Sequence, residues 1–129
     1  MSQFQNIVAA KLGQAPLTTT LTTLYVSTVG GTATTSVNSQ IATQTYMKSI
    51  DICNTTAGAI TVNVGLVPNG ITGLTTATLT PYAIYYGYTV AANSIVQWRG
   101  LQILNPGDSI QVFASTTGCT ITISGAKAT

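Results

Sequence analysis

From Leu24 to the end of the chain, short runs of β-branched and aromatic residues recur in which every second side chain is apolar. In the run Ile60 to Leu66, for example, the apolar side chains fall on the even positions. This period of two is that of a β-strand with one face turned to a core. Turn residues such as Pro68-Asn69-Gly70 and Asn105-Pro106-Gly107-Asp108 separate the runs. The pattern predicts an all-β fold.

The runs predict about seven to nine short strands, and no segment has the pattern of a long helix. Residues 28–40 and 69–81 are rich in Thr, Gly and Ser, so we expect long loops there. Many short strands separated by turns are typical of an antiparallel β-sandwich or jelly roll. We expect one such domain over residues 24–129. The expected strands cover 24–28, 41–53, 60–66, 82–90, 94–104, 110–114 and 121–123.

Residues 1–23 differ from the rest of the chain. Phe4, Ile7, Val8 and Leu12 could share one face of a short helix, but Gly13 and Pro16 follow too soon for that helix to be stable alone. We expect an extended N-terminal arm that becomes ordered on a partner through these four apolar side chains. A frayed chain end is the alternative.

Charge is scarce, with four basic and two acidic residues and no His. The net charge of +2 comes from scattered side chains, which argues against binding to nucleic acid. No run of about 18 apolar residues is present, so we expect no membrane-spanning helix. The first ten residues lack the basic start and apolar run of a secretion signal, and we therefore expect the chain in the cytosol of the producing cell.

The same scarcity limits catalysis. Without His, catalytic Ser-His-Asp and Cys-His arrangements are excluded. Asp51 and Asp108 are the two carboxylates available for a glycosidase-type pair. Asp108 follows Pro106-Gly107, where an Asp side chain commonly bonds to the turn backbone, and Asp51 falls on the solvated face of its strand. We expect neither an enzyme nor a cofactor.

Cys53 and Cys119 could be two buried free thiols, one disulfide or a reactive site. Free thiols are favoured, because a protein assembled in the cytosol meets reducing conditions. The two residues lack the clustered spacing of a structural zinc site, so we expect no metal.

Tyrosines gather in one strand. Tyr82, Tyr86 and Tyr88 should lie on one face of it and Tyr85 on the other, with Trp98 nearby in sequence. Exposed Tyr clusters are frequent in interfaces and sugar-binding faces, so Tyr82, Tyr86 and Tyr88 are candidate partner-binding residues. Packing in the core with the hydroxyls at the rim is the alternative.

Seven short motifs, taken in order, resemble those of a group of small virion proteins of tailed bacteriophages. The chain differs from that group in its low charge and in the Thr- and Gly-rich segment around residues 30–40. The matching motifs are Leu12-Gly13-Gln14, Thr23-Leu24-Tyr25, Lys48-Ser49-Ile50, Ile52-Cys53-Asn54-Thr55, Val62 to Pro68, Leu104-Asn105-Pro106-Gly107-Asp108-Ser109-Ile110, and Thr120-Ile121-Thr122-Ile123-Ser124-Gly125.

The resemblance implies a β-sandwich that sits on a phage particle and has no catalytic residues. We expect a capsid decoration (cement) protein, made in the bacterial cytoplasm, that binds the major capsid protein at the capsid surface as a homodimer or homotrimer. A surface with so few charges does little to oppose such association. A tail or fibre component that recognises host surface glycans is the alternative.

Overall fold

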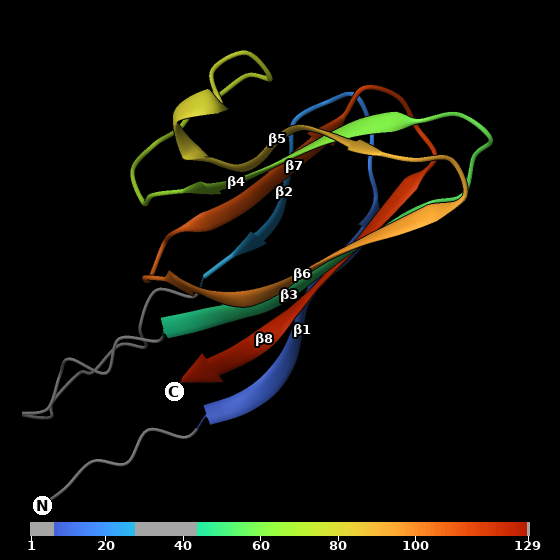
Figure 1. The fold of residues 1–129 in the computed structure, drawn as a ribbon. Helices are drawn as coiled ribbons and strands as arrows, with labels where there is room; N and C mark the ends of the chain where they lie inside the picture. The colour runs from blue at the N-terminus through green and yellow to red at the C-terminus, as the bar shows by residue number, and fades with distance from the viewer. Residues whose placement is uncertain (1–6, 28–43, 129) are drawn as a thin grey trace, which may run out of the picture.

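The structure, a computed structural model, describes residues 7–27 and 44–128 as two four-stranded antiparallel sheets packed face to face (Figure 1). One sheet has the order β1-β8-β3-β6 and the other the order β2-β7-β4-β5. A short 3-10 helix, η1 (Thr80–Tyr82), precedes β5. The strands are β1 (Ile7–Pro16), β2 (Thr22–Val26), β3 (Gln44–Asn54), β4 (Ile60–Val67), β5 (Ala83–Val90), β6 (Ser94–Leu104), β7 (Ser109–Ala114) and β8 (Cys119–Ala128).

Consecutive strands alternate between the two sheets, except that β4 and β5 form a pair within one sheet. Eight antiparallel strands wound between two sheets in this way form a jelly roll. The predicted β-sandwich is confirmed. None of the helical segments within residues 7–27 and 44–128 is long and apolar enough to cross a membrane.

The core lies between the sheets and is built from the alternating positions that the sequence indicates. Ile50 and Ile52 of β3 are fully buried, as are Val62 and Val64 of β4. Burying one such side chain contributes about 1.5–3 kcal/mol. The strands therefore keep their register, because a slip of one residue would expose this row to water. Other strands add Leu104, Ile110, Val112, Ile121 and Ile123.

The predicted loop over residues 69–81 is present between β4 and β5. It ends in η1 and folds back over the outer face of β4, where Leu79 is buried and fills the space above Gly65. A Cβ atom at position 65 would come within 2.6 Å of the Leu79 side chain, so a larger residue there would force Leu79 to move. The loop expected over residues 28–40, and residues 41–43 of the expected strand 41–53, lie outside the described residues.

The N-terminal arm expected over residues 1–23 needs correction. From Ile7 onward the chain is part of the sandwich, because β1 pairs with β8 along its length. Leu12 and Leu17 enter the core, and the Leu17 N–H donates to the carbonyl of Cys119 at 2.8 Å. The neighbouring strand supplies the hydrogen bonds that an isolated helical turn would lack. Phe4 lies outside the described residues.

Candidate functional site

The apolar residues proposed for partner binding in β1 divide into two groups. Ile7 and Val8 are exposed, at 66% and 56%, on a strand at the free edge of its sheet. Leu12 is 6% exposed and belongs to the core, so it is not available to a partner, contrary to the expectation from sequence. The difference arises because β1 is a strand, in which Leu12 takes an inward position.

The tyrosines of β5 are arranged around a bulge. Tyr85 lies opposite Val64 and Tyr88 opposite Val62, so one extra residue of β5 is accommodated between the two pairs. Gly87 takes a φ of 59° there, and its N–H donates to the side-chain oxygen of Asn63 at 2.8 Å. A positive φ is readily adopted by glycine. The bulge therefore resets the alternation of side chains along the strand.

As a result, Tyr85 and Tyr88 share one face, with their rings in contact at a centroid distance of 5.2 Å. The expectation that they lie on opposite faces is wrong. Burial raises the pKa of Tyr85, and neighbouring Tyr88 adds to the increase. Tyr86 is 66% exposed, Tyr88 is 45% exposed, and Tyr82 is half-buried in η1. The three candidate tyrosines do not form one flat face.

A row of exposed apolar side chains lies on β6, the other strand at the free edge of the β1 sheet. Ile95, Leu101 and Ile103 are 61%, 55% and 50% exposed. Between them along the strand, Val96 and Trp98 pack against the core. Sequence reasoning missed this row. The sequence could have predicted the row, because apolar residues occupy both odd and even positions of 94–104. A strand with one solvated face needs apolar residues at only one of these two sets of positions.

The two carboxylates take part in ordinary structural contacts. Asp51 is half-exposed on the outer face of β3, as predicted, and accepts a hydrogen bond from Arg99 of β6 at 2.9 Å. Asp108 accepts hydrogen bonds from the N–H groups of Asn69 and Asn105, each at 2.9 Å, which confirms its predicted role in the turn. The Asp108 carboxylate thereby ties the β6–β7 turn to the segment that follows β4.

The two cysteines belong to neighbouring strands but to opposite faces. Cys119 lies opposite Asn54 and is buried inside, whereas Cys53 lies opposite Ile95, whose side chain points outward. Two separate thiols fit this geometry, and a bond between them does not. Burial raises the pKa of the Cys119 thiol, and Cys53 adds to the increase. Within residues 7–27 and 44–128, no group of three or more His, Cys, Asp or Glu side chains could hold a metal ion.

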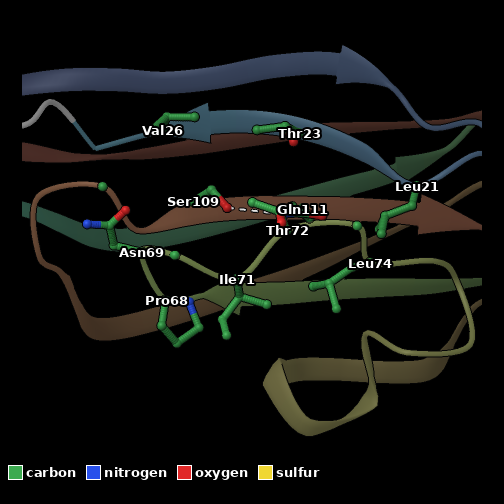
Figure 2. A pocket seen from close by; sticks show the side chains of 13 residues that line it. Leu21, Thr23, Val26, Pro68, Asn69, Ile71, Thr72, Leu74, Ser109 and Gln111 are labelled. Carbon is green, nitrogen blue, oxygen red and sulfur yellow. Dashed lines mark hydrogen bonds between the residues drawn. The ribbon is translucent and has the colours of Figure 1, made fainter.

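A groove of about 440 Å³ lies on the outer face of the β2 sheet, between β2, β7 and the segment 68–74 (Figure 2). Leu21, Val26 and Leu74 give it apolar walls, and Gln111 donates to Ser109 across its floor at 3.2 Å. None of its lining residues is charged. No motif in the sequence predicts this groove, because the groove forms only when the segment after β4 folds back over the sheet.

No protein-family model matches the chain. No curated protein matches it either. Among solved structures, the chain is similar to one from Desmodium yellow mottle tymovirus, with a TM-score of 0.56 and 13% identity, covering 99% of this chain and 89% of that one. It is also similar to a chain from the structure of infectious bursal disease virus Gx strain, with a TM-score of 0.51 and 10% identity. That match covers 98% of this chain but 32% of the other. At these identities the likeness shows the fold.

Proposed function

We propose that the chain is a structural protein of a virus particle. The observation that carries this proposal is the match between nearly the whole of this chain and 89% of a chain from a virus structure. A single jelly roll accounts for the described residues of this chain. Jelly rolls are a recurrent solution for viral capsid domains.

Within that role, we propose that the chain is a decoration (cement) protein of a tailed bacteriophage that binds the major capsid protein at the capsid surface. The ordered motifs from Leu12-Gly13-Gln14 to the closing strand support this assignment, because they resemble those of small phage virion proteins. The scarcity of charge supports it too. Arg99, one of four basic residues, is already paired with Asp51, so still less charge opposes close packing of subunits.

A second candidate is a tail or fibre component that binds host glycans. The exposed rings of Tyr86 and Tyr88 favour it, since aromatic side chains stack on sugars and jelly rolls also occur in lectins. The two exposed rings flank the bulge at Gly87 and lie at the free edge of the β2 sheet.

Co-sedimentation with phage heads tests the first candidate. Purified chain is added to heads assembled without it, and the bound amount and the thermal stability of the heads are measured. Binding at a fixed number of copies per head, with a rise in the melting temperature of the shell, is the expected result. Absence of binding to heads, together with a glycan-array signal that is lost in Tyr86→Ala, would favour the second candidate instead.

A further inference from the structure

Within residues 7–27 and 44–128, the sheet order leaves four strands at free edges, and three of them are short, bulged at the edge, or contain Pro and Lys. β1 contains Lys11 and Pro16 and a register shift near Gly13. β2 has only five residues, and β5 is bulged at Gly87. Short length, Pro, Lys and bulges are the usual protections of an edge strand. β6 has 11 residues and contains neither Pro nor Lys. Its register against β3 shifts between Arg99 and Gln102, but Leu101 and Ile103 beyond the shift are exposed like Ile95 and Gln97 before it.

The outer face of β6 carries, in order, Ile95, Gln97, Arg99, Leu101 and Ile103. All five side chains are exposed. The guanidinium of Arg99 reaches sideways over β3 to Asp51, at 2.9 Å, and not toward the free edge. The one charge on this strand is therefore paired within the subunit and does not prevent another strand from pairing with β6.

We propose that β6 pairs with β6 of a second copy, antiparallel and about a two-fold axis at Trp98, so that two four-stranded sheets join into one of eight strands. In this register Ile95 lies opposite Leu101 of the second copy, and Gln97 lies opposite Arg99 of the second copy. Apolar side chains meet apolar ones, and an amide meets a guanidinium. A two-fold axis at Arg99 instead would place like charges directly opposite each other, which is unfavourable.

The inner face of β6 fits the same register. Trp98 lies opposite Trp98 of the second copy, and Val96 lies opposite Gly100 of the second copy. A Cβ atom at position 100 would come within 2.7 Å of the Trp98 ring, so the indole lies across the bare backbone of Gly100. Each subunit therefore brings a large aromatic ring beside the axis, and paired aromatic residues on adjacent strands stabilise a sheet.

The occupant of this edge is a second copy because the side-chain order of β6 is complementary to itself when the strand direction is reversed. A strand of another protein would need to reproduce that order. This inference deepens the self-association in the proposed function. It concerns contacts between copies of the chain, whereas the proposed role depends on contacts with a capsid.

Sedimentation of the full chain at graded concentrations tests the interface, with Leu101→Lys and Ile95→Lys as variants and Val26→Lys as the matched control. Val26 is 53% exposed on β2 and takes no part in the β6 edge. The wild type is expected to be dimeric, each β6 variant to raise the dimer dissociation constant at least tenfold, and the control to leave it unchanged. Circular dichroism verifies that every variant is folded. A monomeric wild type, or equal effects of folded β6 and control variants, overturns the proposal.

Disulfide trapping tests the register. Gln97→Cys and Arg99→Cys are prepared separately in a Cys53→Ala background, since Cys53 lies beside Ile95 on the same face. On oxidation, a cross-linked pair is expected when the two variants are mixed and not when either is alone. Cross-linking in the single variants but not in the mixture, or in none of the samples, overturns the register.

Head binding by a monomeric Leu101→Lys variant would leave the decoration role intact, and a dimer that binds no heads would refute that role alone.

Discussion

Replacement of Asn54 should show how far one buried polar side chain holds an end of the sandwich together. This side chain is 1% exposed at the end of β3. Its Nδ2 group donates to the carbonyls of Gly58 at 2.8 Å and Val90 at 3.1 Å. Its Oδ1 atom accepts from the N–H and the hydroxyl of Thr56, at 2.9 and 2.7 Å. One amide thus joins β3, the β3–β4 loop and the end of β5.

Asn54→Ala removes these four hydrogen bonds. A buried group left without its partner costs about 1–3 kcal/mol, and water can reach the loop side, so we expect a loss of about 3 kcal/mol in the free energy of unfolding. That is a large part of the roughly 5–15 kcal/mol typical of a domain, and corresponds to a fall of about 10 °C in Tm. Urea denaturation at pH 7 measures it. Thr117→Ala, at an exposed position of the turn between β7 and β8, is the control and should change the free energy by less than about 0.5 kcal/mol.

Asn54→Asp separates hydrogen bonding from size. The carboxylate keeps the acceptor for Thr56 but faces the carbonyl oxygens of Gly58 and Val90, and burial raises its pKa above that in the unfolded chain. Stability of this variant should therefore fall as pH rises above about 4. The reasoning is refuted if Asn54→Ala stays within about 0.5 kcal/mol of wild type, or if the Asp variant gains stability relative to wild type between pH 4 and 7.

Three further results are expected. Gly125→Ala should lower the free energy of unfolding by more than about 2 kcal/mol or prevent folding, because a Cβ there would collide with the backbone carbonyl of Tyr46. Gly58→Ala should be nearly neutral, because the space around Gly58 is open, and urea denaturation compares the two variants. Asp51→Asn should cost less than about 1 kcal/mol in the same assay, since its ion pair is exposed, and a larger loss would contradict this description. Stability should fall as pH rises above about 8.5, because the raised pKa of Cys119 means that the folded state retains a proton that the unfolded chain releases. Thermal scans should show a shallower fall for Cys119→Ala, and an unchanged slope would argue against this cause.

The alternation of side chains was sufficient to predict most of the strands. The segment 94–104 was predicted with the bounds that β6 has, and Ile50 and Ile52 were placed correctly on the inner face of β3. Such patterns predict strands well because one face of each strand is buried in a shared core, so the apolar side chains mark the buried face.

β1 and the register of β5 could not be predicted in this way, because each depends on a residue far away in the sequence. The backbone of β1 is satisfied by β8, at the opposite end of the chain. The bulge at Gly87 is held by Asn63 of β4, and only that contact places Tyr85 and Tyr88 together. Local propensity contains no information about either partner.

The row of Ile95, Leu101 and Ile103 illustrates the same limit for the candidate site. The sequence shows that 94–104 is apolar on both faces, which by itself is typical of a central, fully buried strand. Only the sheet order places this strand at an edge, where the outward row is exposed and can meet another subunit.

An electron cryomicroscopy map of the assembled particle tests the central claim most directly, because location and subunit contacts appear together. We predict jelly-roll density at regularly repeated positions on the outside of the head, with β6 of one subunit running antiparallel to β6 of its neighbour. A head without this density, with the chain instead at the tail or absent from the particle, would contradict the account.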